Sequence, residues 1–329
     1  MSLDVSAVQE SHPQRDMHPA GPGQPPAAQK RFESQRIMPN TVHAVPDYLL
    51  IGHIAHDITP EGPRLGGTVS YGAHTAAAFG LRVAILTSTR PDEPLLRDLP
   101  PGVEVVSVPA EHTTTFENRY GPAGRTQYLH HRALTLTPDM LPPAWRQARL
   151  VHLAPIAYEV DPAFATAFGE RPICVTPQGF MRQREPDGLV TATPWTSAQQ
   201  VLSRAALTVL SEEDIRHAPE LEGVFAAMGP LVVVTRAERG GTYYRDGVPS
   251  DYAAVPVTQV SPTGAGDVFA VALHIALHEL GDMDRAIALA SYLGAQSVTR
   301  AGFASAPTAE EIAEAWRRAG VPLVEPVED

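Results

Sequence analysis

Apolar residues along this chain form short continuous runs that alternate with stripes of helical spacing. The runs predict buried strands, and these lie at 47–52, 83–87, 150–153, 172–176, 207–210 and 231–235. The stripes predict helices, which lie at 70–79, 161–168, 196–205, 218–228, 267–280, 284–298 and 308–318. Strands that alternate with helices are typical of a parallel sheet in an α/β protein.

The segment 103–136 has a different pattern. Residues 103–108 and 113–120 alternate and are rich in β-branched and aromatic side chains, and 126–130 follow a Gly-Pro-Ala-Gly turn at 121–124. This order predicts an antiparallel β unit inside the α/β chain. We expect it to form a small subdomain or lid.

Residues 1–44 predict a disordered tail, because they are rich in proline, glycine, glutamine and histidine and show no hydrophobic period. The folded domain is then expected at 45–329. The longest nearly apolar run, 268–277, is much shorter than the roughly 20 residues of a membrane span. The N-terminus has no apolar core of the signal-peptide kind, so we expect a cytoplasmic protein with no membrane partner.

Composition excludes several classes of function. The chain has 25 Lys+Arg against 37 Asp+Glu, a net charge of −12, which argues against nucleic acid or an anionic membrane as partner. The one cysteine excludes disulfide frameworks and cysteine-rich zinc sites. Lys30 is the sole lysine and lies in the predicted tail, which excludes a Walker A loop and a Schiff-base lysine.

The strongest local signal for chemistry is the sequence Ser-Pro-Thr-Gly-Ala-Gly-Asp at 261–267, directly before a long apolar helix. Three small residues at a helix start leave backbone N–H groups uncovered beside the positive end of the helix dipole, a place that suits an anion. Asp267 would lie beside this cradle and accept a proton from a hydroxyl group. The alternative is structural: a tight turn in which Asp267 caps the helix.

This segment resembles the late signature of the ribokinase-like (PfkB) carbohydrate kinase family, Asp-Thr-x-Gly-Ala-Gly-Asp, and the resemblance extends over most of 47–310. It implies a three-layer α/β sandwich with a mostly parallel central sheet and a β lid from about 61–69 and 103–136. It also implies that the amides of Gly264, Ala265 and Gly266 form an anion hole, with Asp267 as the catalytic base. Ser261 replaces the first aspartate of the signature.

The acceptor residues of the family have counterparts near the first strand. Gly52-His-Ile-Ala-His-Asp57 resembles the family's first-strand motif, so the resemblance implies that Asp57 holds substrate hydroxyls. Gly66 and Gly67 match the family's diglycine, which contacts substrate and serves as a lid hinge. Tyr71 stands where the family has a sugar-contacting asparagine, which leaves the identity of the substrate open.

The resemblance also implies a donor site for ATP with Mg²⁺, and it allows a monovalent cation near Ser261. Ser211-Glu-Glu-Asp214 occupies the place of the family's Asn-x-x-Glu, so Asp214 is the candidate magnesium residue, with a helix N-terminus as the alternative. The residues expected to bind the nucleotide phosphates are Thr235, Arg236, Gly240 and Thr263. Arg236 would supply the cation that a lysine-free domain needs.

Four short matches resemble one branch of the family, the plant-type myo-inositol kinases. They are His56-Asp57, the Gln-x-x-x-Arg of Gln178 and Arg182, the serine and acids at 211–214, and Pro262-Thr263. This likeness implies a cyclitol substrate contacted by Gln178 and Arg182. Otherwise these two residues are ordinary polar groups at a strand-to-loop junction.

Histidines offer a rival site that the pattern does not complete. His274 and His278 are four residues apart on a predicted helix, a spacing that can hold a metal ion, but no third ligand is evident. We expect them at the edge of the core or on the surface. His130 and His131 point to opposite faces of a predicted strand and cannot bind one ion together.

The sequence therefore predicts an ATP-dependent phosphotransferase acting on a hydroxyl of a small-molecule sugar or cyclitol. Pairing of lid-edge strands between subunits would make it a homodimer. A nucleoside kinase of the same fold and a non-catalytic sugar or nucleotide sensor remain open as alternatives. A dinucleotide-binding oxidoreductase is a weaker rival, because its third glycine and ribose-binding acid are missing around Gly264 and Gly266.

Overall fold

The computed structural model describes residues 43–121 and 124–321. The chain divides into two units, 1–42 and 43–329, and the description here is of the second. The boundary lies close to the predicted one at residue 44. Apart from residues 43 and 44, the predicted tail lies outside the described residues.

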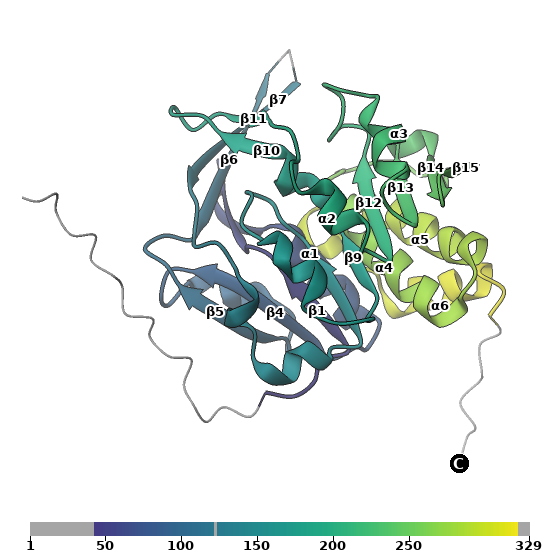
Figure 1. Ribbon diagram of the computed structural model, residues 1–329, viewed down its shortest axis with the longest axis horizontal. Coiled ribbons are helices and arrows are strands. Elements are labelled where there is room, and N and C mark those ends of the chain that lie inside the picture. The colour runs from purple at the N-terminus through teal and green to yellow at the C-terminus, as the bar shows by residue number, and fades with distance from the viewer. Residues whose placement is uncertain (1–42, 122–123, 322–329) are drawn as a thin grey trace, which may run out of the picture. The chain divides into compact units, whose positions relative to one another are not determined.

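A nine-stranded sheet forms the centre of this unit (Figure 1), in the order β15-β14-β13-β12-β9-β8-β1-β4-β5. Seven neighbouring strands are parallel: β1 (Tyr48–Ile51), β4 (Val83–Thr89), β5 (Glu104–Pro109), β8 (Leu150–Leu153), β9 (Ile173–Val175), β12 (Leu207–Ser211) and β13 (Leu231–Thr235). An antiparallel pair, β14 (Gly241–Arg245) and β15 (Val248–Tyr252), completes one edge. Each strand predicted from an apolar run is present.

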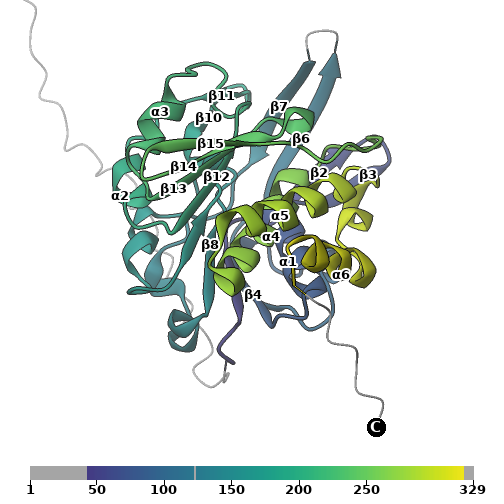
Figure 2. The same ribbon diagram turned by 90° about the vertical axis from the view of Figure 1, so that its right-hand side faces the viewer.

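Helices cover both faces of the sheet, because its central strands are apolar on both sides. In β1, Leu49 and Ile51 pack into one core cluster, while Tyr48 and Leu50 pack into another on the opposite face. Figure 2 shows the helices on one side of the sheet, which are α1 (Thr68–Ala78), α4 (Ala265–Leu280), α5 (Met283–Ser297) and α6 (Ala309–Arg318). On the other side lie α2 (Ala198–Leu202), α3 (Leu221–Ala226) and several 3₁₀ turns. The predicted three-layer sandwich is therefore present.

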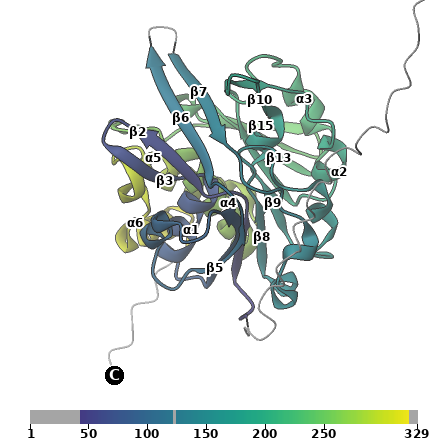
Figure 3. The ribbon, with the colours of Figure 1, turned by 90° about the vertical axis from the view of Figure 1, so that its left-hand side faces the viewer.

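A second sheet of four strands forms the lid (Figure 3), in the order β3-β2-β6-β7. Its members are β2 (Ala55–Thr59), β3 (Gly62–Gly66), β6 (Thr114–Gly121) and β7 (Gly124–His131). A hairpin of β10 (Arg182–Arg184) and β11 (Val190–Ala192) lies beside β7, where the Leu129 N–H donates to the Gly188 carbonyl at 2.8 Å. The sequence did not predict this hairpin.

The predicted extent of the lid is wrong at one strand. Residues 103–108 were expected in the antiparallel unit, but β5 is the edge strand of the main sheet and runs parallel to β4. The cause is its position: an edge strand is only half buried, so it alternates in hydrophobicity like a lid strand. The antiparallel β unit begins instead at β6, and β2 joins it directly after the first strand of the core.

The carboxyl ends of the parallel strands meet at one edge of the sheet, and the lid rises from this edge. The loops after β1, β8, β9, β12 and β13 therefore open toward a common space. In open α/β sheets, ligands bind outside the carboxyl ends of the strands.

Candidate active site

The start of α4 has the open backbone that the sequence predicts. Gly264 precedes the helix with φ +86°, a left-handed conformation, and a Cβ there would collide with the Tyr71 ring. A Cβ on Gly266 would meet nothing within 4 Å, so one side of this turn is open. The first amides of a helix have no carbonyl partner within it, although the Ala265 N–H donates weakly to the Pro262 carbonyl at 3.3 Å. The turn can therefore receive an anion.

Asp267 lies in the first turn of α4, beside this opening. Burial, together with the smaller effect of the Asp214 charge, raises the pKa of its carboxyl group to about 6. A hydrogen bond from the Thr68 hydroxyl and the positive charge of Arg182 act in the opposite direction. Above pH 6 the group is ionised and has the proton affinity that suits a general base.

Asp57 lies on β2 in the lid, with Arg64 of β3 and Phe116 of β6 as its cross-strand neighbours. A Cβ on Gly66 would coincide with the Asp57 carboxylate, so a side chain there would displace this carboxylate. Gly67 follows with φ +91°, and a Cβ on it would lie 2.6 Å from the His53 carbonyl oxygen. The predicted diglycine thus brings Asp57 against the beginning of α1.

Tyr71 connects the two carboxylates. Its side chain is 9% exposed, and burial, then Asp267, then Asp57 raise the pKa of its phenol to about 12. Its ring packs on Gly264 and against Phe303, with ring centroids 4.9 Å apart. Because both carboxylates act on this one phenol, Asp57 and Asp267 lie near the same part of α1.

The ends of two neighbouring strands supply a third carboxylate to the site. Asp214 follows β12, and its two oxygens accept hydrogen bonds from the Gln178 side-chain amide and the Ser211 backbone N–H, each at 3.0 Å. Gln178 follows β9, so these contacts join residues that the sequence singled out separately. Asp214 lies near enough to Asp267 to raise its pKa.

Asp214 fits a role toward magnesium only through water or together with a ligand. Among residues 43–121 and 124–321, no group of three or more His, Cys, Asp or Glu side chains can hold a metal ion. Each Asp214 oxygen accepts one hydrogen bond and keeps a second lone pair. Mg²⁺ usually keeps several waters and is bound by one or two carboxylates together with substrate phosphates, which this arrangement allows.

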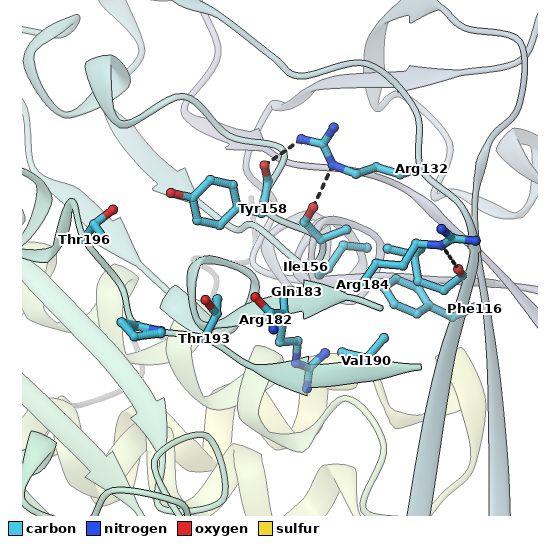
Figure 4. Close-up of a pocket in the computed structure, with 13 residues that line it drawn as sticks. Phe116, Arg132, Ile156, Tyr158, Arg182, Gln183, Arg184, Val190, Thr193 and Thr196 are labelled. Atoms are coloured by element: carbon cyan, nitrogen blue, oxygen red, sulfur yellow. Dashed lines mark hydrogen bonds between the residues drawn. The ribbon is translucent and has the colours of Figure 1, made fainter. Parts of the chain in front are cut away.

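Arg182 connects the β10–β11 hairpin to the lid. It is the first residue of β10 and donates from Nη1 to the Gln127 side-chain oxygen of β7 at 3.0 Å. Its charge also lowers the pKa of Asp267. Figure 4 shows it in a cavity of about 410 Å³, lined by lid residues, the loop 156–158, the β10–β11 hairpin and the segment 193–196.

The predicted nucleotide residues lie at the end of β13 and in the loop before α4. The Thr235 hydroxyl donates to the Leu210 carbonyl at 3.4 Å, and Thr263 is exposed. Gly240 has φ +84°, and a Cβ there would collide with the Tyr252 carbonyl, so the turn after β13 requires glycine.

Arg236 is fixed by protein contacts. It is half-buried and donates to the Glu222 carboxylate at 2.5 Å and to the Thr242 hydroxyl at 2.9 Å. Of the two arginines that the sequence analysis singled out, Arg182 is the one whose charge lowers the pKa of Asp267.

Several residues of the site were missed by the sequence analysis. Thr68 donates to Asp267, Arg64 acts on Tyr71, and the loop 156–158 lines the cavity. The position of Thr68 directly after the diglycine is its one sequence signal. The others come together only through strand pairing, which residue spacing does not reveal.

The two histidines with metal-ligand spacing are not a site. His274 is buried, and its Nδ1 shares a hydrogen bond of 3.1 Å with the Tyr48 hydroxyl. His278 accepts a hydrogen bond from Arg149 at 3.1 Å. They are a core residue and a surface residue, as predicted.

Within the described residues, no helix is long and apolar enough to cross a membrane.

Comparison with known sequences gives a matching family model and two similar proteins of the same name. The model of the pfkB family of carbohydrate kinases matches residues 126–310. An inositol 3-kinase of Zea mays is 27% identical over 315 residues, which cover 85% of this chain and 79% of that protein. An inositol 3-kinase of Oryza sativa subsp. japonica is 25% identical, over 77% of this chain and 68% of that protein.

Comparison with solved structures gives the same fold at lower identity. A pyrophosphate-dependent kinase of the ribokinase family, complexed with a pyrophosphate analog and myo-inositol, has a TM-score of 0.67 and 22% identity, over 82% of this chain and 99% of that one. Arabidopsis thaliana ribokinase, complexed with ribose and ATP, has a TM-score of 0.63 and 16% identity, over 83% of this chain and 99% of that one.

Proposed function

The chain belongs to the PfkB family of carbohydrate kinases and has a ribokinase-like fold, and on this premise we propose that it transfers the γ-phosphoryl group of ATP to a hydroxyl of a sugar or cyclitol. Membership confirms the predicted family, fold and enzyme class. The donor, the acceptor and the roles of individual residues are the content of the proposal.

Asp267 is the proposed base. Its pKa of about 6 leaves it ionised at neutral pH, yet basic enough to take a proton as the acceptor oxygen attacks phosphorus. The hydrogen bond from Thr68 fixes the carboxylate without protonating it. The proton moves from the acceptor hydroxyl to Asp267 while the bond between the γ-phosphorus and the bridging oxygen of ADP breaks.

The open turn at Gly264, Ala265 and Gly266 is the proposed anion hole. Its backbone N–H groups and the positive end of α4 stabilise negative charge that grows on the phosphates during transfer. The absence of side-chain atoms around Gly266 allows a phosphate to approach the backbone closely. In phosphoryl transfer the protein contributes mainly positioning and charge stabilisation, and this turn provides both.

The acceptor is proposed to lie between the lid and α4. Asp57, which lies against Gly66, accepts hydrogen bonds from two acceptor hydroxyls. Gln178 and Arg182 contact the acceptor from the opposite side, anchored by Asp214 and Gln127. The inositol 3-kinases among its relatives support a cyclitol as one acceptor.

The donor is proposed to lie along Thr235, Gly240 and Thr263. Arg236 follows Thr235 in the chain and is held in place by Glu222. Mg²⁺ bound with the nucleotide would supply charge neutralisation between the β- and γ-phosphates. Asp214 would hold it through water, in line with its fixed carboxylate and second lone pairs.

The single observation that carries the proposal is the convergence of Asp57, which lies against Gly66, and Asp267 on Tyr71, whose ring packs on Gly264 before α4. A structural cap on α4 has no need of a second carboxylate from the lid. An acceptor held by Asp57 therefore presents its hydroxyl within the site that contains the base.

An acceptor and donor panel tests the proposal. ATP and pyrophosphate serve as donors, because two similar solved structures are of a pyrophosphate-dependent kinase. The acceptors are myo-inositol, ribose, fructose and adenosine, and the readout is ADP or phosphate release with product mass. We expect ATP-dependent transfer to a sugar or cyclitol. Transfer to adenosine alone would indicate a nucleoside kinase, and ligand binding without any transfer would indicate a sensor.

A further inference from the structure

The cavity of about 410 Å³ borders the proposed acceptor site, with which it shares Arg182. Phe116 in its lining is the cross-strand neighbour of Asp57. The Ile156 side chain, also in the lining, lies 3.4 Å from where a Cβ of Gly67 would be. Arg182 lines the cavity and acts on Asp267. Cavities for small ligands measure about 300–1,000 Å³, so this space is large enough for a bound molecule.

The charged side chains that line the cavity are all positive. Its lining includes three arginines, Arg132, Arg182 and Arg184, and no aspartate or glutamate among the described residues that line it. The whole chain has a net charge of −12, so this concentration of positive charge opposes the general trend. Arginine forms strong, charge-assisted hydrogen bonds with carboxylates and phosphates. The arginines of the lining therefore favour an anionic ligand.

Two of these arginines can offer N–H groups from fixed positions. The contacts described for Arg184 use one of its five N–H groups, Nε, which donates to the Leu129 carbonyl at 2.6 Å. Those described for Arg132 use three, which donate to the Ala157 and Tyr158 carbonyls and the Thr135 hydroxyl. Both residues are exposed, so a ligand can reach them. Anchored guanidinium groups lose little freedom on binding, which favours affinity.

The wall opposite the hairpin is rigid. The buried carboxylate of Glu159 accepts hydrogen bonds from the backbone N–H groups of His53, Ile156 and Ala157 at 2.6–3.0 Å. Tyr158 on this loop has φ +58°, an uncommon conformation for a residue with a side chain, and its side chain is 41% exposed. Strained residues held by rigid surroundings cluster at binding sites, which fits an aromatic wall for a sugar ring.

The donor does not occupy this cavity in the proposed arrangement. None of the described residues that line it comes from β12, β13 or α4, which carry the proposed donor site. Arg182 and Arg184 lie on the same face of β10, about 7 Å apart along the strand. An anion at Arg184 would therefore lie about one sugar ring away from Arg182, and Arg182 is the arginine that acts on Asp267.

We propose that the ligand of this cavity carries an anionic group, a phosphate or a carboxylate, which Arg184 and Arg132 bind, and that this ligand is the acceptor, with its hydroxyl facing Asp267. The binding of the anionic group does not depend on the proposed kinase function, whereas the role of the ligand as acceptor rests on it. The acceptor class narrows to sugar or cyclitol phosphates and sugar acids.

The test is a comparison of matched neutral and anionic ligands by titration calorimetry. The pairs are ribose and ribose 5-phosphate, glucose and glucose 6-phosphate, glucose and glucuronate, and myo-inositol and its monophosphate. We expect at least one anionic member to bind at least tenfold more tightly than its neutral partner. The phosphate and carboxylate arms distinguish the two groups. Equal affinity within every pair would overturn the inference, whether or not any variant folds.

A variant locates the binding group. Arg184→Gln should weaken binding of the anionic member about tenfold and leave its neutral partner within twofold. Arg204→Gln, on an exposed arginine at the end of α2, is the matched control and should change neither. An equal loss for both members in Arg184→Gln would contradict the assignment to Arg184.

Binding and turnover separate this inference from the kinase proposal. If the anionic ligands bind as expected but no donor gives transfer, the kinase proposal fails and the anion site stands. If neutral sugars are phosphorylated and the anionic ones bind no better, the kinase proposal stands and this inference fails.

Discussion

At Asp267, burial and a neighbouring carboxylate act together on one group. Both disfavour the charged form, while Thr68 and Arg182 favour it, and the balance is a pKa of about 6 instead of the usual 3.8. The tuning therefore uses residues from three places: α1, the β10–β11 hairpin and the turn after β12. An aspartate that only capped its helix would be stabilised as the anion, with a lowered pKa.

The pH dependence of turnover follows from this pKa. The base must be deprotonated to act, so kcat/KM should fall about tenfold for each pH unit below about 6 and level off above it. The measurement is kcat/KM from pH 4.5 to 8 with a fixed acceptor, in buffers of constant ionic strength. A profile that is flat across pH 5–7 would show that Asp267 does not titrate in the rate-limiting step.

The same group affects stability. A carboxyl group whose pKa is raised on folding stabilises the protein below pH 3.8, and this contribution is lost as the pH rises through about 6. Asp267→Asn should therefore increase the free energy of unfolding at pH 8, by at most about 3 kcal/mol, with little change at pH 4. Urea unfolding of both proteins at the two pH values checks this. A variant less stable at pH 8 would show that the ionised carboxylate stabilises the fold.

At the scale of elements, the site depends on how α1 and α4 begin. Both start after a glycine of positive φ, and Tyr71 of α1 packs against Gly264 at the start of α4. The sequence predicted both helices and both glycines but treated Tyr71 as a departure from the family. Its role as a contact between the helices depends on their packing, which local spacing does not encode.

Two glycine substitutions separate backbone shape from phosphate access. Gly264→Ala forces a left-handed alanine against the Tyr71 ring and should cost roughly 2–4 kcal/mol of stability along with activity. Gly266→Ala meets no atom within 4 Å and should leave stability unchanged or up to about 1 kcal/mol higher. Its methyl group enters the open side of the turn, so kcat/KM should fall while the protein stays folded. Normal activity of folded Gly266→Ala would argue against the anion hole.

The lid shows what sequence patterns miss. Strands β6 and β7 were predicted, and residues 122–123 of the predicted turn lie outside the described residues. Strand β5 was misassigned and the β10–β11 hairpin was not predicted. Three-residue strands leave almost no periodicity to detect. The homodimer remains a prediction, and β3 is the lid edge through which it would form, since the hairpin lies beside β7. Pro63 removes one donor from this edge, which weakens strand pairing there.

At the scale of the whole molecule, β1, β8 and α4 meet around a buried polar group on one face of the sheet. The Tyr48 hydroxyl lies 3.2 Å from His152 Nδ1 and 3.1 Å from His274 Nδ1. Burial lowers the pKa of His152 to about 3 and that of His274 well below its usual value. The sequence predicted the strands and helix that carry these residues, but the contact spans 226 positions and leaves no local signal.

Acid should therefore unfold the protein. Histidines with lowered pKa values stabilise the fold above about pH 6.5, and this stability is lost as the pH falls toward 3. Two such histidines outweigh the opposite effect of Asp267, so the free energy of unfolding should decrease steadily from pH 7 to pH 4. Denaturant titrations at unit pH steps measure this, with His152→Asn as the comparison. A constant value from pH 7 to pH 4 would contradict the neutral, buried state of these histidines.

The most direct test of the account is the turnover of Asp267→Asn with the best acceptor from the panel. General-base catalysis contributes about 10²–10⁴-fold, so kcat should fall within that range. The dissociation constant for ATP, measured on the same preparation, should stay within about threefold, because the proposed donor site consists of other residues. A kcat within tenfold of the unaltered protein would contradict the assignment of Asp267 as the base.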